Sequence, residues 1–158
     1  MLANPKLVNL PLANPMDKLL KYNYLTNKKY INFLLEHPFD EGYTLLSHIL
    51  NAQHIWNERI VSKVPEISPW QVLEPSTWES INTTNYNQSM DIIVGVDLSK
   101  VISYTNSQNA LFTNSIKDIM HHVVNHSSYH RGQIASKATQ LGLKPPATDY
   151  ILFARSDW

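Results

Sequence analysis

The chain of 158 residues contains no cysteine, and this absence excludes several kinds of chemistry. Without cysteine there are no disulfide bonds, no catalytic thiolate and no cysteine-ligated zinc or iron–sulfur site. The chain also has no net charge, since 13 basic residues balance 13 acidic residues. This balance argues against DNA, RNA and anionic membranes as partners, because those partners attract basic surfaces.

Long apolar runs are also absent. No segment approaches the roughly 20 apolar residues that cross a bilayer, and the start of the chain, MLANPKLVNLPLANP, lacks the basic and apolar segments of a secretory signal. We therefore expect a cytoplasmic protein with no membrane contact. Hydrophobic residues make up 43% of the chain, which is typical of a globular protein. The length suits a single domain over residues 1–158.

Helical periodicity is the main pattern that is present. Apolar residues recur at helical spacing in four segments and predict helices over residues 16–36, 43–62, 76–94 and 116–141. Pro38 ends the first helix, because the residue before a proline disfavours the helical conformation. Ser115 and Asp118 form a capping-box pattern before the last helix, and Gly142 suits the left-handed position after it.

The connecting segments complete the predicted fold. Residues 101–105 alternate in polarity, residues 106–109 suit a turn and residues 110–113 form a second short run, which together predict a β-hairpin. An irregular crossover loop is the alternative. Prolines make the first 15 residues an extended lead-in, and apolar residues in the tail predict that it packs back on the helices. We expect an all-α fold: a four-helix bundle with a long crossover connection at residues 63–75 and a small β-hairpin before the last helix.

Histidines recur every four residues in the last predicted helix, within the string HHVVNHSSYHRGQI. His122, His126 and His130 therefore lie one turn apart, near one face of the helix. His126 and His130 fall within its apolar stripe, where a buried imidazole must find a partner. Two histidines at this spacing can bind one metal ion.

His48 occupies a comparable inward position on the second predicted helix. A single histidine on an apolar face is more often a structural residue bonded to a carbonyl group or water. Three inward-facing histidines from two helices favour a shared divalent metal, for which Zn²⁺, Ni²⁺ and Fe²⁺ are suited. Three protein ligands also leave a coordination position free, as in catalytic sites. His122 competes for a place in this set, because it could pair with His126, and the spacing does not decide between them.

Other polar residues near these positions have simpler interpretations. His54 points away from His48 around its helix, His121 points away from His126, and His37 lies in a turn. Arg131 is interpreted as a surface residue or as a partner of the C-terminal segment. Gln133 lies one turn beyond His130 and is interpreted as a helix-packing residue, with contact to a bound ligand as the alternative.

Two sequence strings resemble a known family. HHVVNHSSYHRGQI followed by LGLKPPATDYILF resembles the C-terminal signature of the DinB-like, damage-inducible family, and SHILNAQHIWNERI resembles its second-helix signature. The resemblance extends over most of the chain. It implies a four-helix bundle that forms a homodimer and a metal centre with one histidine from the second helix and two from the last. In this sequence those ligands are His48, His126 and His130.

The resemblance also implies a class of function. The wider superfamily includes thiol-dependent transferases and isomerases that use mycothiol, bacillithiol or glutathione. We therefore expect a divalent-metal-dependent enzyme with a small-molecule substrate, a thiol S-transferase or a hydrolase, whose metal activates a thiol or water. The lack of cysteine fits a thiol supplied by a small molecule and fits water equally well. The alternatives are a non-catalytic, stress-related metal or small-molecule binder, and a structural bundle whose histidines bond to each other.

Overall fold

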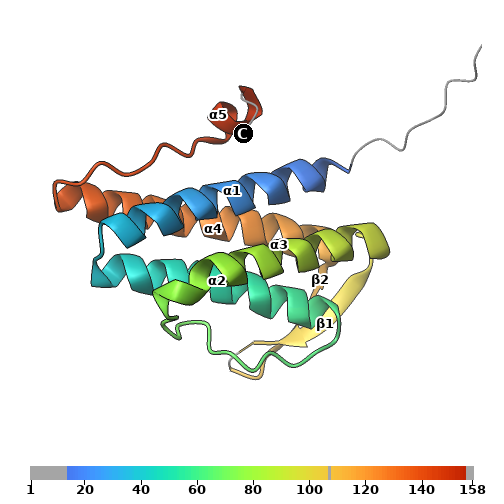
Figure 1. The fold of residues 1–158 in the computed structure, drawn as a ribbon. Coiled ribbons are helices and arrows are strands. Elements are labelled where there is room, and N and C mark those ends of the chain that lie inside the picture. The colour runs from blue at the N-terminus through green and yellow to red at the C-terminus, as the bar shows by residue number, and fades with distance from the viewer. Residues whose placement is uncertain (1–13, 107, 156–158) are drawn as a thin grey trace, which may run out of the picture.

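The computed structural model describes residues 14–106 and 108–155. Its four long helices lie side by side (Figure 1): α1 (Pro15–Glu36), α2 (Asp40–Ile60), α3 (Trp78–Gly95) and α4 (Ile116–Gln140). The smaller elements are η1 (Pro75–Thr77), β1 (Val101–Thr105), β2 (Leu111–Ser115) and α5 (Tyr150–Arg155). The predicted mostly helical fold with a small antiparallel hairpin is confirmed. The predicted lead-in falls mainly on residues 1–13, which lie outside the described residues.

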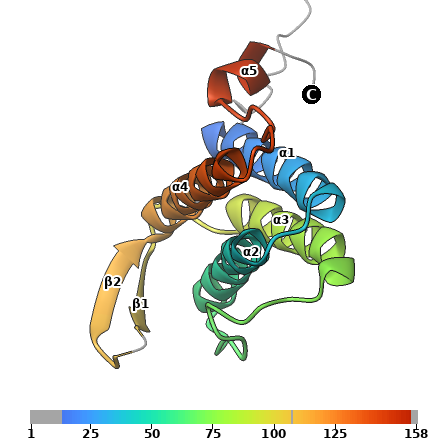
Figure 2. The same cartoon turned by 90° about the vertical axis from the view of Figure 1, so that its left-hand side faces the viewer.

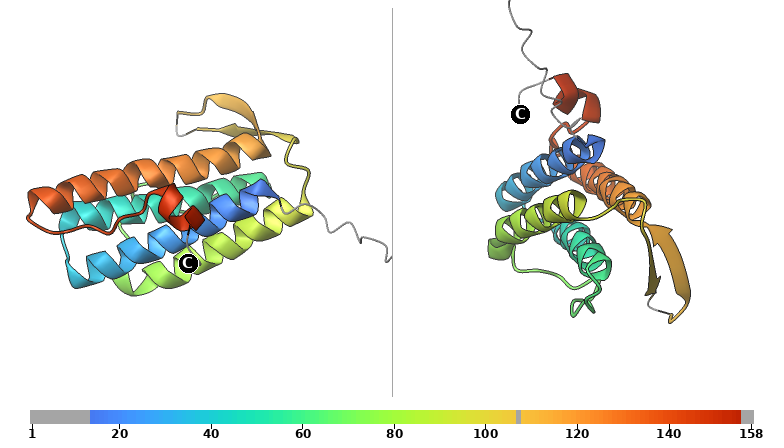
Figure 3. Two further views of the ribbon diagram at one scale, coloured as in Figure 1. Left: turned by 90° about the horizontal axis from the view of Figure 1, so that it is seen from above. Right: turned by 90° about the vertical axis from the view of Figure 1, so that its right-hand side faces the viewer.

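The direction of the helices follows from one long connection. Residues 61–74 run back along the helices from the end of α2 to the start of η1, so that α2 and α3 run in the same direction (Figures 1 and 3). α1 and α4 run in the opposite direction. α2 packs against α3 and α4, and α1 packs against the same two helices. α2 and α4 are thus antiparallel neighbours.

The hairpin extends from one end of the helices, on the side of α2 and α4 (Figure 2). β1 and β2 pair from Val101 with Ser115 to Thr105 with Leu111. The second strand is therefore shifted toward the C-terminus from the predicted residues 110–113. Arg59 on α2 donates from Nη2 to the carbonyl oxygen of Thr105 at 3.2 Å, which ties the strand to the helix.

The capping predicted at the two ends of α4 is present, whereas α2 begins and ends earlier than predicted. Ser115 accepts from the backbone N–H of Asp118 at 3.1 Å, as the capping box predicts. Gly142 has φ of 77° directly after α4, in the left-handed region that favours glycine. α2 begins at Asp40 rather than near residue 43, because Asp40 and Glu41 place carboxylates in its first turn, where they favour the positive helix end.

The core has two apolar clusters at opposite ends of the helices. The cluster nearer the start of α1 contains Met16, Leu20, Tyr22, Ile60, Ile92, Ile93, Ile116, Ile119, Met120, Val124 and Phe153. The other contains Tyr30, Ile31, Phe33, Leu34, Leu46, Ile49, Leu50, Trp78, Ile134 and Ala138. Between the two clusters lie buried polar side chains from all four long helices, which we call the polar layer: Asn23, Asn27, Gln53, Asn57, Asn82, Asn85, Ser89 and Arg131.

Arg131 is the centre of the polar layer, which corrects its interpretation as a surface residue. Its side chain is only 1% exposed. Nη1 donates to the amide oxygens of Asn23 at 2.9 Å and Asn27 at 2.6 Å, and Nη2 donates to the hydroxyl of Ser128 at 3.0 Å. These bonds join α4 to α1 and solvate the buried charge with protein dipoles.

The C-terminal segment packs on α1, as predicted. The Phe153 ring is buried against Tyr22, with ring centroids 5.5 Å apart. The Tyr22 hydroxyl donates to the carbonyl oxygen of Thr148 at 2.6 Å. Figure 1 shows α5 lying beyond α1, on the side away from α2. Among the described residues, no helix combines the length and the apolar character needed to span a membrane.

Candidate metal centre

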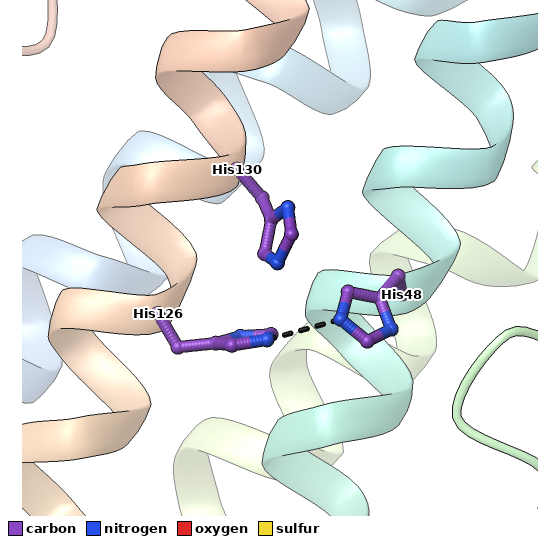
Figure 4. Close-up of side chains that lie close together, drawn as sticks. All are labelled: His48, His126 and His130. Carbon is purple, nitrogen blue, oxygen red and sulfur yellow. Dashed lines mark hydrogen bonds between the residues drawn. The ribbon is translucent and has the colours of Figure 1, made fainter.

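His48 of α2 faces His126 and His130 of α4 across the contact between the two helices (Figure 4). Each ring offers a nitrogen, and the three nitrogens lie within 4.8 Å of one another. His48 is 7% exposed and His130 is 8% exposed, while His126 is half-buried. The structure therefore brings together the three histidines singled out in the sequence, and we call them the histidine group.

Hydrogen bonds on the outer side of two rings fix their tautomers. His48 donates from Nδ1 to the carbonyl oxygen of Pro69 at 2.8 Å, and His130 donates from Nδ1 to Oε1 of Gln133 at 2.7 Å. A carbonyl oxygen can only accept, so each of these rings carries its proton on Nδ1. Nε2 of both rings then presents a lone pair, as in metal sites where an outer acceptor orients a histidine.

The ring nitrogens of the histidine group that face one another, here called the inner nitrogens, are mostly unprotonated and act as acceptors. Nε2 of His48 and Nε2 of His126 are 3.0 Å apart, and His130 points toward the same space (Figure 4). While the rings are neutral, at most one of the three inner nitrogens carries a proton. Three nitrogens bound to zinc at 2.0–2.1 Å in tetrahedral geometry lie about 3.4 Å apart. The rings therefore need only small shifts to fit one cation, and their chemistry suits Zn²⁺, Ni²⁺ or Fe²⁺.

Burial favours the neutral form of these rings. Burial, and after it the neighbouring His130, His48 and His122 in that order, together lower the pKa of His126 to about 3. Burial also lowers the pKa of His48, although its bond to the Pro69 carbonyl opposes the change. Both rings are therefore neutral near pH 7, which is the form that binds metal.

Trp70 covers one side of the histidine group. Its ring lies flat on the His48 ring, with centroids 3.6 Å apart and planes within 3°. The connection that carries Trp70 is held by Asn51 of α2, which donates to the carbonyl oxygen of Gln71 at 2.7 Å, and by Ser47, which accepts from the N–H of Leu73 at 3.0 Å. Sequence reasoning missed Trp70, because the pattern of a proline-rich connection does not say which side chains turn inward.

Other residues discussed from the sequence take different places. The ring centroid of His122 is 5.5 Å from that of His126, and His122 is outside the histidine group found in the described part of the chain. His54 and His121 also lie outside the group, and His37 is exposed at the end of α1. Gln133 accepts a hydrogen bond from His130 and orients its ring, a contact that neither interpretation of Gln133 from the sequence included. The position of Gln133 three residues after His130 on one helix was the sequence feature from which this contact could have been predicted.

Comparisons with known proteins place the chain among its relatives. A relative, Protein DinB from Bacillus subtilis (strain 168), is 24% identical over an alignment of 159 positions that covers 86% of this chain and 91% of the relative. The model of the DinB family matches residues 19–157, which include all three members of the histidine group. On the strength of this match over most of its length, the chain belongs to the DinB family.

Proposed function

We propose that this chain is a four-helix-bundle metalloprotein that binds one divalent cation, Zn²⁺, Ni²⁺ or Fe²⁺, through Nε2 of His48, His126 and His130. One observation carries the proposal: three ring nitrogens converge within 4.8 Å, while Nδ1 of His48 and of His130 donates outward. Buried acceptors that face each other need a donor or a cation. Membership of the DinB family supports the same assignment.

We further propose that the protein is an enzyme of the thiol S-transferase or hydrolase type. When bound by three imidazoles, a divalent cation takes a water or thiol as a further ligand and lowers its pKa toward neutrality. The chain itself orients the rings through Pro69 and Gln133 and shields His48 from water with Trp70. Because the sequence has no cysteine, a thiol must come from the substrate.

Metal analysis tests the ligand assignment. The purified protein and the variants His48→Ala, His126→Ala and His54→Ala are compared by elemental analysis after the same preparation. His54 is on the same helix as His48 and outside the histidine group, so His54→Ala is the matched control. We expect about one ion per chain in the wild type and the control, and almost none in the other two. Near-stoichiometric metal in His48→Ala and His126→Ala would refute the assignment.

A second experiment tests the class of activity. Mycothiol, bacillithiol and glutathione are each mixed with an electrophilic aryl halide, and a parallel set of esters and amides is offered for hydrolysis. Each reaction is followed with and without a chelator. Turnover that the chelator abolishes supports the enzyme proposal and separates transfer from hydrolysis. Full metal occupancy with no turnover on either panel contradicts it and favours the non-catalytic binder.

A further inference from the structure

A cavity of about 210 Å³ lies between α2, the hairpin and α4, close to the histidine group. Trp56 of α2, Tyr104 of β1 and His122 of α4 form its aromatic walls. The remaining lining residues are Asn114, Asp118 and Ile119.

His122 connects the cavity to the histidine group. Its ring centroid lies 5.5 Å from that of His126 and 5.5 Å from that of Trp56. α2 and α4 are antiparallel neighbours. Trp56 is two turns after His48 on α2, and it therefore lies level with His122, which is one turn before His126 on α4. The Trp70 ring packs on the group from the connection after α2, with centroids 3.6 Å from His48 and 6.1 Å from His130. The cavity therefore borders the histidine group through His122, and a second cavity borders it through Gln133, which bonds to His130.

The size and the walls of the cavity suit an aromatic ring. An engineered apolar cavity of about 150 Å³ holds benzene, so this larger space admits a six-membered ring with a short substituent. Trp56 and Tyr104 meet edge to face, with centroids 4.8 Å apart. The guanidinium carbon of Arg59 lies over both rings, 4.7 Å from the Trp56 centroid and 5.2 Å from the Tyr104 centroid. Arg59 lines the neighbouring cavity instead of this one. Arg59 thus braces the aromatic wall.

Asp118 brings an unpaired acceptor to the cavity. Oδ2 of Asp118 accepts from the Ser115 hydroxyl at 2.7 Å, while its Oδ1 has no hydrogen-bond partner among the described residues. The Tyr104 hydroxyl donates its proton to Oδ1 of Asn114 at 2.7 Å and so presents lone pairs elsewhere. Asp118 is the only charged residue in the described lining. The unpaired oxygen of this carboxylate favours a cationic donor.

We propose that this cavity is the substrate subsite of the histidine group and that it takes a flat aromatic group bearing a protonated amine. The role as a subsite rests on the metal centre proposed above. The preference for an aromatic amine rests on Trp56, Tyr104 and Asp118, and it can be measured without metal.

Ligand-observed saturation-transfer NMR tests the preference with benzylamine, benzyl alcohol and phenylacetate as probes. We expect benzylamine to bind most tightly and phenylacetate not to bind. Trp56→Ala should weaken benzylamine at least tenfold, and Asp118→Asn should remove the preference for the amine over the alcohol. Leu45→Ala, in a separate cavity between α2 and α4, is the control and should change neither. Asp118 is exposed, so its variant remains informative even if Trp56→Ala does not fold.

Protein loaded with Co²⁺ tests the position of the subsite. Paramagnetic relaxation of the benzylamine protons should be strong in the wild type and should disappear in Trp56→Ala, which retains its cobalt. Binding that is equally tight in Trp56→Ala, or equal for all three probes, overturns the inference and leaves the metal centre intact. Amine binding without relaxation overturns the role as a subsite. A wild type that binds no metal refutes the proposed function, while benzylamine binding to that protein still tests the cavity.

Discussion

His130 and Arg131 are neighbours on α4, yet they belong to two polar regions with opposite chemistry. Arg131 faces α1 and brings a positive charge to the amide oxygens of Asn23 and Asn27. His130 faces α2, where it joins two more imidazoles whose lone pairs converge. Both regions contain buried acceptors. In the polar layer the chain supplies the cation itself, whereas in the proposed metal centre the cation would come from solution.

This difference separates two contributions to stability. The polar layer takes its charge and its hydrogen-bond partners from the chain, with Oδ1 of Asn85 and Nε of Arg131 left without a partner among the described residues. Its contribution should therefore not depend on metal. The histidine group should stabilise the fold only when a cation is bound, because ligand binding to the native state alone raises the free energy of unfolding. The following variants test whether the two regions are independent.

The largest effect is expected for Arg131→Met. The substitution keeps an unbranched apolar stem but removes the donor from two buried amide oxygens. We expect a loss of about 3 kcal/mol in the free energy of unfolding, the combined effect of hydrogen bonds to a charged donor and of acceptors left unpaired. Urea unfolding with and without Zn²⁺ measures it. Lys137→Met, at a surface position of the same helix, should change stability little. A loss of stability that appears only in the presence of metal would show that the two regions are energetically coupled.

Metal addition should give the next largest effect. At free Zn²⁺ about 100-fold above the dissociation constant, the free energy of unfolding should rise by about 2.7 kcal/mol. Arg131→Met should show the full rise from its lower starting value, and His126→Ala should show none. Thermal or urea unfolding across a zinc titration measures this. If His126→Ala is stabilised as much as the wild type, the metal binds elsewhere.

Gln133→Leu should have a smaller and more specific effect. The substitution keeps a side chain of similar size but removes the acceptor that holds Nδ1–H of His130. Loss of such an outer partner typically weakens metal affinity by about 10–100-fold. Competition with a coloured chelator measures the affinity. Gln140→Leu, at an exposed position near the end of α4, is the matched control. Unchanged affinity in Gln133→Leu would mean that this bond does not orient the ring.

Periodicity explains why much of the histidine group could be predicted. The spacing of His126 and His130 within an apolar stripe is a local property of one helix, and His48 has the same relation to its own stripe. The capping pattern of Ser115 and the position of Gly142 are local as well, so they also followed from the sequence. Which ring nitrogens meet depends on how α2 and α4 pack, and that information came only with the structure.

The polar layer could not be predicted in the same way. Asn23 and Asn27 are polar, so a search for apolar stripes places them on the solvent side of the helix, although both are fully buried. Arg131 looked like a surface residue for the same reason. Its partners Asn23 and Asn27 lie more than 100 positions away in the sequence. Pairing over this distance is a tertiary property with no local signal.

The smallest effect is expected for Asn51→Ala, which tests whether the connection over residues 61–74 supports the histidine group. Asn51 holds the segment that carries Pro69 and Trp70. Because Pro69 and Gln71 are exposed, water can replace the lost donor, and we expect a loss of about 1 kcal/mol or less. Hydrogen exchange at the Leu73 amide, which bonds to Ser47, should become faster.

Metal affinity in Asn51→Ala should fall by less than in Gln133→Leu, because the Pro69 carbonyl can still reach Nδ1 of His48 when the segment is merely looser. Asn125→Ala, at an exposed position of α4, serves as the control. If Asn51→Ala weakens metal binding more than Gln133→Leu does, the fixed position of the connection contributes more to orienting the rings than the side-chain acceptor on α4. The histidine group would then depend on a loop, whereas the polar layer is built wholly on helices.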